Sequence, residues 1–223
     1  GDLYKFSRTK MPKRGSFLNS DGWLCFTDGK SIEKIVHKDE IKIPGLHNVE
    51  NYLTAISLLH GDVPNEAFAE TAREFGGVEH RIEFVRELDG VKYYNDSIAT
   101  SPVSVIAGLN SFGRRIIVIA GGSDKKLDYS QLAEPINTYV KTLVLLGETA
   151  DSIEAAVKAY PHYSAEKCRI VRVKTMEEAV KAARENAQSG DVVSLSPASA
   201  SFDLYKNFEE RGRHYKSIVN SLK

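Results

Sequence analysis

The stretch VKYYNDSIATSPVSVIAGL, residues 91–109, passes from a strand pattern to a helix pattern within a few residues. Its first residues, Val91–Tyr94, form an apolar, alternating run that is typical of a strand, and the apolar residues of Val103–Leu109 recur at the spacing of an amphipathic helix. The polar cluster Asn95–Thr100 therefore falls on a corner between a strand and a helix. Such a corner exposes polar side chains together with the free N–H groups of the helix, which suits an anionic ligand.

A purely structural explanation of this corner is open as well. Asp96, Ser97 and Thr100 are of types that cap helices, and they could do no more than cap the helix that follows. The corner gains weight as a binding site only because two further polar corners occur later in the chain.

Strand and helix patterns continue to alternate toward the carboxyl terminus. Apolar runs such as Arg115–Ala120 and Lys141–Leu146 are typical of strands that helices cover on both faces. This alternation predicts an α/β fold with a Rossmann-like, mostly parallel sheet and helices on both of its faces. Strands are predicted over residues 82–88, 91–94, 115–120, 141–146, 169–173 and 192–195, and helices over 129–139, 153–160, 175–188 and 203–222.

The first third of the chain has a different pattern. Gly76-Gly77 is the best linker candidate, because the character of the sequence changes there, so we expect a division into residues 1–77 and 78–223. Antiparallel strands are predicted over residues 4–6, 23–26, 32–36 and 41–43, and helices over 47–60 and 64–75.

Composition excludes several classes of protein. Lys and Arg number 30, as do Asp and Glu, so the totals indicate no nucleic acid and no membrane surface as a partner. The apolar runs have the length of strands and are too short to cross a bilayer. Cys25 and Cys168 lie far apart without paired spacing, which predicts free thiols in a cytoplasmic protein.

Polar corners follow three of the predicted strands. They are residues 95–100, residues 121–126 with the sequence GGSDKK, and residues 196–202 with the sequence SPASASF. The carboxyl ends of parallel strands meet at one edge of a sheet, and ligands bind there. Each corner alone could be an ordinary turn or a helix cap, but together they outline a site for a small anionic ligand.

The common nucleotide and metal motifs are absent from the sequence. No G-x-G-x-x-G opens a helix, and there is no G-x-x-x-x-G-K-[ST] phosphate loop. The six histidines are scattered and do not pair with each other or with cysteine at ligand spacing, so no metal site is expected.

The order of several segments makes the chain similar to the Mur ligases over nearly its whole length, and within that family most similar to the branch that adds D-glutamate. Leu195–Asp203 with Lys206–Glu209 is the most specific mark, and Asn95–Thr100 separates the chain from sister ligases. The segments, in order, are Gly45–Asn51, His80-Arg81, Asn95–Thr100, Gly121–Lys125 and Leu195–Phe208.

The resemblance implies a particular domain organisation. Members of the family have an amino-terminal UDP-sugar domain, a central ATPase domain and a carboxyl-terminal Rossmann-like domain. By this resemblance, residues 1–77 are the partial, carboxyl-terminal part of the α/β central domain, and residues 78–223 are the whole amino-acid-binding domain. The phosphate loop and a modified lysine associated with Mg²⁺ would then lie before Gly1. This chain alone is expected to be inactive, and no catalytic residue is assigned within it.

The resemblance also implies a reaction. ATP, the cosubstrate, converts the alanyl carboxylate of UDP-N-acetylmuramoyl-L-alanine into an acyl phosphate, and the amine of D-glutamate displaces the phosphate to form an amide. This is a step of cytoplasmic peptidoglycan precursor synthesis, and a monomer is expected. Positioning and charge neutralisation would carry most of the rate.

The matching positions imply roles for individual residues. Those assigned to the nucleotide are Asn48 and Asn51 at the adenine and Arg81 and Asp96 at the phosphates and ribose. Those assigned to D-glutamate are Thr100, Lys125, Ser201 and Phe208, with Phe202 acting through its backbone. A dicarboxylate needs a cation, hydroxyls and N–H donors, and this set supplies them.

Two positions depart from the family pattern. Ile98 stands where the family often has lysine, so one cationic contact is missing or comes from elsewhere. Lys126 directly follows Lys125, which leaves open which of the two meets the carboxylate.

Two other functions remain open. The chain could be a stand-alone, non-catalytic Rossmann-like domain that binds an amino acid or a nucleotide. It could also belong to a sister ligase that adds a different amino acid.

Overall fold

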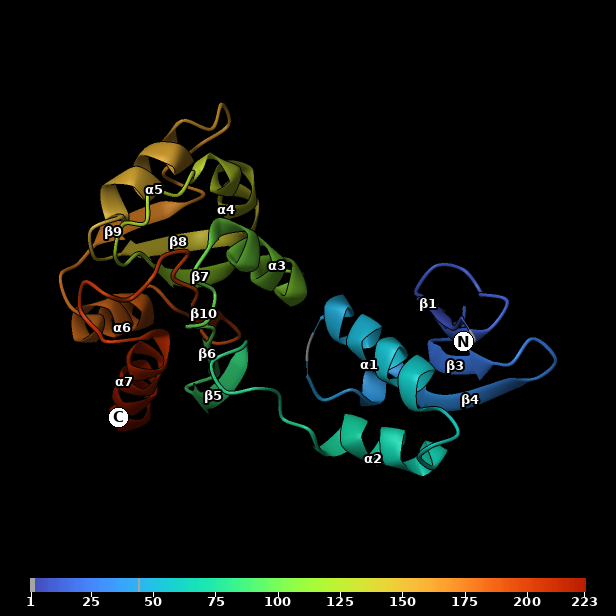
Figure 1. The fold of residues 1–223 in the computed structure, drawn as a ribbon. Helices are drawn as coiled ribbons and strands as arrows, with labels where there is room; N and C mark the ends of the chain where they lie inside the picture. Colours follow the sequence, from blue (N-terminus) through green and yellow to red (C-terminus); the bar gives the residue numbers. More distant parts are fainter. Residues whose placement is uncertain (1–2, 44) are drawn as a thin grey trace. The chain divides into compact units, whose positions relative to one another are not determined.

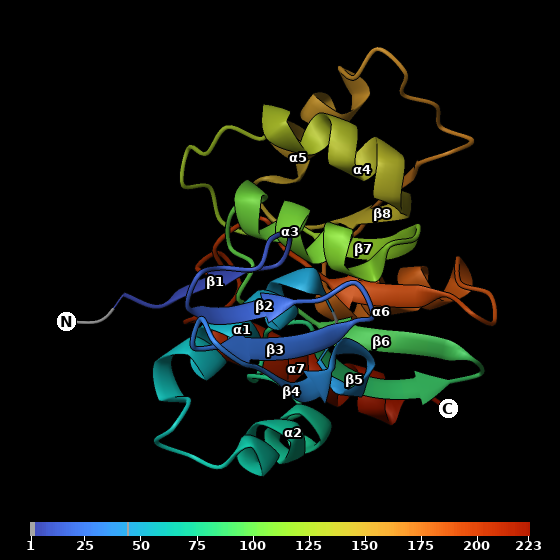
Figure 2. The same cartoon turned by 90° about the vertical axis from the view of Figure 1, so that its right-hand side faces the viewer.

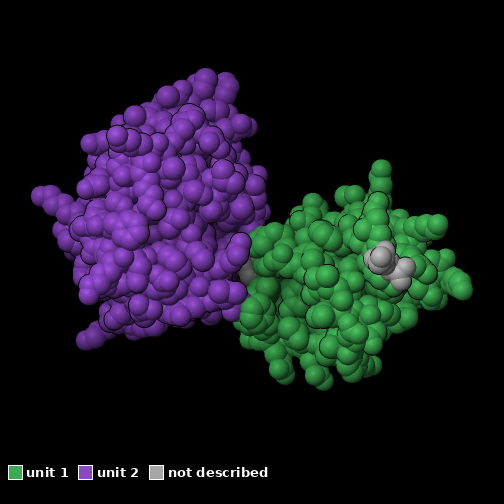
Figure 3. All heavy atoms as spheres, viewed as in Figure 1, with its two compact units in different colours: residues 1–76 green, residues 77–223 purple. Residues whose placement is uncertain are grey.

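The computed structural model describes residues 3–43 and 45–223. Gly1, Asp2 and Pro44, which belong to the predicted amino-terminal segment, lie outside the described residues. The chain forms two compact units, residues 1–76 and residues 77–223 (Figure 3). Each unit has its own sheet and its own hydrophobic core.

The first unit is a four-stranded sheet with two helices, and its strands lie in the order β1-β2-β3-β4 (Figure 2). Helix α1 packs on the first three strands and α2 packs on the fourth. Leu53 and Ile56 of α1 are fully buried in the core with Leu24 and Phe26. The elements are β1 (Lys5–Ser7), β2 (Gly15–Leu18), β3 (Trp23–Thr27), β4 (Ile32–His37), η1 (Lys38–Glu40), α1 (Leu46–Leu59) and α2 (Asn65–Glu74).

Three expectations about this unit are wrong. No strand forms over residues 41–43, because the N–H of Lys42 donates to the carbonyl of Ala72 in α2 (2.9 Å) and so does not take part in a sheet. Strand β2 is missing from the prediction, since Gly-Ser-Phe-Leu carries only a weak strand pattern. Strand β1 pairs in parallel with β2, so the sheet is mixed rather than wholly antiparallel.

The second unit is a six-stranded sheet in the order β5-β6-β10-β7-β8-β9. The β5–β6 hairpin is antiparallel and all other pairs are parallel, which confirms the predicted mostly parallel α/β sheet. The strands are β5 (Glu83–Leu88), β6 (Val91–Asn95), β7 (Ile116–Ala120), β8 (Val140–Leu145), β9 (Arg169–Arg172) and β10 (Val192–Leu195). The helices are α3 (Pro102–Phe112), η2 (Ser130–Leu132), α4 (Ala133–Tyr139), α5 (Ala150–Lys158), α6 (Met176–Glu185) and α7 (Phe208–Ser221).

Helices cover both faces of this sheet (Figure 1). Successive strand residues point to opposite faces, so Ile116 and Val118 of β7 pack in one core with α3, α4 and α5. Ile117 and Ile119 pack in the other core with α6 and α7. All four side chains are fully buried, which explains why this strand is apolar without alternation.

The structure fixes where two of the helices begin. Helix α3 starts at Pro102 with Ser101 as its N-cap, and the Ser101 hydroxyl accepts the N–H of Ser104. The capping explanation of Asp96, Ser97 and Thr100 is therefore wrong. Helix α7 starts at Phe208 rather than Asp203, because residues 201–205 form a turn and Asn207 supplies the cap.

Two global features bear on the classes of protein considered above. No helix within residues 3–43 and 45–223 is both long enough and apolar enough to cross a bilayer. Cys25 and Cys168 are both buried free thiols.

The separate cores predict that residues 77–223 fold without the first unit. Thermal denaturation followed by circular dichroism should give this fragment the same midpoint as the matching transition of the whole chain. A fragment of residues 83–223, which loses the buried His80, should melt at a lower temperature. A fragment of residues 77–223 without a cooperative transition would contradict the division into independent units.

Candidate functional site

The strand order brings the three polar corners together. Because β10 lies between β6 and β7 and all three run in parallel, the corners at residues 95–100, 196–202 and 121–126 are neighbours at one edge of the sheet. Main-chain hydrogen bonds join them: Asp96 N–H to Leu195 O (2.8 Å), Ala198 N–H to Ala99 O (2.9 Å), Gly121 N–H to Pro197 O (2.8 Å) and Ser123 N–H to Ala200 O (3.0 Å).

A buried arginine holds this edge from beneath. Arg211, in the first turns of α7, is only 2% exposed. Its Nε donates to the Ser97 hydroxyl (3.0 Å) and its Nη2 to the Ser97 carbonyl (2.9 Å). Its Nη1 donates to the carbonyls of Ser199 (3.1 Å) and Ala200 (3.0 Å). One guanidinium thus fixes two of the corners relative to each other.

The third corner is shaped around the same arginine. Gly122 has a φ of +153°, and a Cβ there would lie 2.0 Å from the carbonyl oxygen of Ala200 and 3.1 Å from Arg211 Nη1. Only glycine permits this approach. Burial lowers the pKa of Arg211 to about 10, an effect that the charge of Asp203 opposes. The group therefore stays charged at neutral pH inside the protein.

Arg211 is not predicted from the sequence, because the residues around it form no recognisable motif. The available signal is its position, since Arg211 shares the buried face of α7 with Tyr215 and Val219 at intervals of four residues. A charged side chain on an apolar helix face is rarely buried unless its hydrogen bonds are satisfied, which makes it a candidate for an internal tether.

Two of the residues predicted to bind D-glutamate, Lys125 and Phe202, meet at the surface of this edge. Lys125 Nζ lies 5.1 Å from the centre of the Phe202 ring, a cation–π distance. Both side chains are exposed. The N–H of Phe202 donates to the Ser123 hydroxyl (3.2 Å), so its backbone is already engaged in joining two corners. Lys126 is exposed as well, and its backbone is in the left-handed region with a φ of +55°.

The remaining D-glutamate candidates surround this pair at different depths. Ser201 is buried, while Thr100 and Phe208 are half-buried. The carbonyl of Phe208 accepts the Ser97 hydroxyl (2.7 Å), which links the start of α7 to the first corner. Ile98, at the position where the family often has lysine, is half-buried and donates its N–H to the carbonyl of His80 (3.2 Å).

Asp96 is buried rather than open to solvent. It is 4% exposed, and its carboxylate accepts the N–H of Ile82 (3.2 Å) and faces α3 at Gly108, where a Cβ would come within 3.0 Å. Burial raises the pKa of Asp96 to about 7, although the N–H of Ile82 and the charge of Arg81 act in the opposite direction. A ribose contact by Asp96 would require this carboxylate to become accessible.

The other nucleotide candidates are more accessible. Arg81 is exposed on the turn that precedes β5. Asn48 and Asn51 lie in the first two turns of α1, in the other unit, where the side-chain amide of Asn51 donates to the side-chain Oδ1 of Asn48 (3.2 Å). The amide side chain offers a donor and an acceptor side by side, as the edge of adenine does.

One group of side chains has the composition of a metal site. Carboxylate oxygens of Glu79 and Glu83 and a ring nitrogen of His80 lie within 4.8 Å of one another. The ammonium of Lys216 already bridges the two carboxylates, at 2.9 and 2.7 Å. The amide of Asn95 donates to His80 Nδ1 (2.8 Å), so the ring proton sits on Nε2, the nitrogen that faces Glu79. This donor set fits Lys216 and does not fit Mg²⁺.

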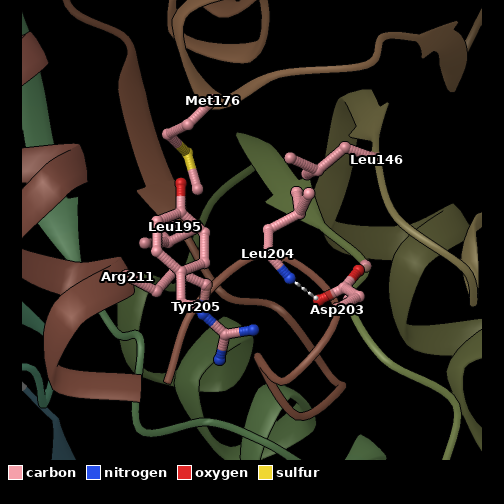
Figure 4. Close-up of a pocket in the computed structure, with 9 residues that line it drawn as sticks. Leu146, Met176, Leu195, Asp203, Leu204, Tyr205 and Arg211 are labelled. Carbon is pink, nitrogen blue, oxygen red and sulfur yellow. Dashed lines mark hydrogen bonds between the residues drawn. The ribbon is translucent and has the colours of Figure 1, made fainter. Parts of the chain in front are cut away.

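A small cavity lies behind the corners (Figure 4). It is lined by Leu146, Met176, Leu195 and Arg211 among others, and it offers about 10 Å³ to the centre of a water molecule. That is room for about one water and not for an amino acid. An amino acid would therefore have to bind outside this cavity.

Comparison with known proteins identifies what the chain is similar to. The family described as "Mur ligase, glutamate ligase domain" matches residues 80–199. The UDP-N-acetylmuramoylalanine–D-glutamate ligase of Acetivibrio thermocellus is 49% identical over 100% of this chain and 48% of its own length. The corresponding ligase of Clostridium tetani is 47% identical over 100% of this chain and 47% of its own length. The chain thus spans about half the length of the curated relatives it matches.

Solved structures share the fold at low sequence identity. The UDP-N-acetylmuramate-alanine ligase MurC of Thermotoga maritima has a TM-score of 0.66 at 17% identity, over 98% of this chain and 48% of its own. A folylpolyglutamate synthase of Mycobacterium tuberculosis, complexed with ADP and AMPPCP, has a TM-score of 0.60 at 10% identity, over 93% of this chain and 48% of its own.

The buried Asp96 should make the stability of the second unit depend on pH. Its folded-state pKa is raised from 3.8 to about 7, so the stability gained from its protonation is complete below about pH 4 and is lost as the pH rises through 7. Asp96→Asn should therefore stabilise the second unit at pH 8 by up to about 4 kcal/mol, at about 1.4 kcal/mol for each pKa unit. The variant should change little at pH 4.

Urea denaturation at both pH values measures this difference. Asp128→Asn is the matched control, because the N–H and hydroxyl of Ser130 lower the pKa of this exposed carboxyl, and neutralising it should not stabilise the protein at pH 8. Equal effects of Asp96→Asn at the two pH values would show that the buried carboxyl is not the cause.

Arg211→Met should destabilise the second unit by about 3 kcal/mol, since it leaves several buried acceptors without their donor. Amide hydrogen exchange in residues 197–201 should accelerate as well. Arg213→Met, at an exposed position of the same helix, is the control and should alter the free energy of unfolding by less than about 0.5 kcal/mol. Similar losses in the two variants would argue against the tether.

Proposed function

Because the chain belongs to the Mur ligase family, we propose that it forms part of an enzyme that joins D-glutamate to UDP-N-acetylmuramoyl-L-alanine with cleavage of ATP to ADP and phosphate. The observation that carries this proposal is the 49% identity, over the whole chain, to a UDP-N-acetylmuramoylalanine–D-glutamate ligase. We assign residues 78–223 to amino-acid binding and residues 1–77 to the end of the central ATPase domain.

The geometry of the sheet edge supports recognition of a dicarboxylate. Lys125 supplies a cation at the surface, and its cation–π contact with Phe202 keeps the ammonium near the edge before substrate arrives. Thr100 and Ser201 bring hydroxyl donors from the corners at residues 95–100 and 196–202. We propose that these residues hold the two carboxylates of D-glutamate and leave its amine free to react.

The role of this chain in the chemistry is positioning. An oxygen of the alanyl carboxylate attacks the γ-phosphorus of ATP and ADP leaves; the D-glutamate amine then attacks the acyl carbon, and phosphate leaves with the C–O bonding pair while the amine loses a proton. The chain's residues orient the amine, and holding both reactants in line converts a bimolecular step into an effectively unimolecular one.

The nucleotide assignments form a second part of the proposal. Arg81 is an exposed cation that fits a phosphate, and Asn48 and Asn51 offer amide groups that fit adenine. Asp96 fits a ribose hydroxyl only if its buried carboxylate becomes accessible. We assign Mg²⁺ to residues outside this chain and derive no step from it. We further propose a monomer that acts in the cytoplasm.

A test of the function uses the full-length enzyme with ATP and the UDP-linked precursor. Release of ADP should depend on D-glutamate, and L-glutamate should not replace it. Lys125→Ala and Ser201→Ala should each raise KM for D-glutamate by about tenfold or more, because a charge-assisted hydrogen bond contributes about 1.5–3 kcal/mol.

The neighbouring lysine supplies the matched control. Lys126→Ala should leave KM for D-glutamate within about twofold of the original enzyme. If Lys126→Ala has the large effect and Lys125→Ala does not, the assignment of the cation is wrong. Release of ADP that depends on another amino acid would favour a sister ligase, and binding of D-glutamate without any ligation would favour the non-catalytic binding domain.

A further inference from the structure

The turn that carries Arg81 is strained. Two of its residues, His80 (φ +66°) and Ile82 (φ +45°), lie in the left-handed region of backbone conformation. This region is unfavourable for residues with a Cβ and especially for β-branched ones such as isoleucine. Such strain persists only where the surrounding structure enforces it, and it concentrates at functional sites. The contacts that enforce it therefore bear on how Arg81 works.

The first contacts are buried hydrogen bonds on either side of Arg81. The His80 side chain is almost fully buried, and its ring accepts the amide of Asn95 (2.8 Å). The N–H of His80 donates to Glu83 Oε2 (2.9 Å), and the N–H of Ile82 donates to Asp96 Oδ1 (3.2 Å). These bonds fix both flanks of the turn to the strand β6 and its corner.

The second contact comes from α7. Lys216 Nζ donates to Glu79 Oε1 (2.9 Å) and to Glu83 Oε1 (2.7 Å), so one ammonium joins the residue before His80 to the residue after Ile82. The Lys216 side chain is 23% exposed, so solvent and salt screen its two bonds less than they would screen a fully exposed ion pair. The two carboxylates raise the pKa of Lys216 even though burial acts against its charge.

Arg81 itself is bonded to none of the side chains of this network. It is exposed and forms no ion pair within the described part of the chain, whereas its neighbours in the turn are bonded to the protein. The turn is therefore fixed on both sides of Arg81, while the Arg81 guanidinium remains accessible to a ligand. A phosphate that binds Arg81 would meet a guanidinium on a backbone that is already ordered.

We propose that Lys216 is a positioning residue: by bridging Glu79 and Glu83 it locks the strained 79–82 turn and so presents Arg81 to the phosphates of the nucleotide. This inference rests on the proposed function for the identity of the ligand. It goes further in assigning a role to a lysine of α7 that is not among the residues assigned to the nucleotide. The same helix carries Arg211, so α7 supports both the turn and the corners.

The first experiment tests the lock without any ligand or activity. Amide hydrogen exchange of Ile82, whose N–H donates to Asp96, is measured by nuclear magnetic resonance in the 223-residue chain. Lys216→Met should accelerate this exchange by about tenfold, and Lys216→Arg, which can still bridge two carboxylates, should restore it. Lys158→Met, which breaks the ion pair with Glu154 on α5, is the control and should leave it unchanged.

The second experiment tests the positioning of Arg81 in the full-length enzyme. Lys216→Met should raise KM for ATP about fivefold, with kcat and KM for D-glutamate altered by less than twofold, because only the ordering of one arginine is lost. Arg81→Met should have a larger effect on KM for ATP. The double variant should be no worse than Arg81→Met alone, since Lys216 is proposed to act only through Arg81.

The outcomes separate this inference from the proposed function. Additive effects of Lys216→Met and Arg81→Met, or unchanged exchange at Ile82, would overturn the inference even in an active enzyme. An enzyme that releases no ADP with D-glutamate would overturn the proposed function, and the nucleotide role of Arg81 with it, while the exchange experiment still decides the lock. If Lys216→Met does not fold, Glu79→Gln removes one of its two partners at an exposed position and should give a smaller change in the same direction.

Discussion

The hydrogen bonds of one buried guanidinium are the constraint on which the site depends. Arg211 reaches Ser97 in the corner after β6 and Ser199 and Ala200 in the corner after β10, while Gly122 of the third corner leaves it room. Removing a charge from water is costly unless its donors are satisfied. Every side-chain nitrogen of Arg211 has an acceptor, so the charge can remain buried and the corners become rigid.

The same constraint explains why the edge tolerates unfavourable features. Asp96 is a carboxyl group whose burial disfavours its charge, and the nearby turn at residues 79–82 contains left-handed backbone. Both cost stability, and both lie where the tethered corner, β6 and α7 surround them. The two apolar cores of the second unit offset these costs, since sites with strained or desolvated groups are less stable than the scaffold that carries them.

The sequence predicts the scaffold far better than the interior of the site. Apolar runs such as Arg115–Ala120 carry their own evidence for buried strands, and polar residues after a strand indicate a corner, so the corners could be located without a structure. The order β6-β10-β7 could not, because strand order depends on long-range pairing that leaves no local pattern. The bond from Arg211 to Ser97 and the bonds from Lys216 to Glu79 and Glu83 could not be predicted for the same reason, because each joins residues more than 100 positions apart in the chain.

The side chains that are candidates for binding the ligand lie outside the hydrogen-bonded corners. Specificity can therefore change without a change of fold. Most of the hydrogen bonds that join the corners are between main-chain atoms. Other sequences can form the same bonds, provided that glycine occupies the position of Gly122, where the backbone comes close to Ala200. Lys125 and Phe202 project from this backbone into solvent and carry little of the packing. Under the proposed function, a change at these exposed positions would alter which amino acid is held and would leave the corners in place. Solved structures with only 10–17% identity and TM-scores of 0.60–0.66 are compatible with such a framework. The proposed recognition of D-glutamate therefore depends on the side chains at the open edge, and the buried Arg211 fixes the backbone that carries them.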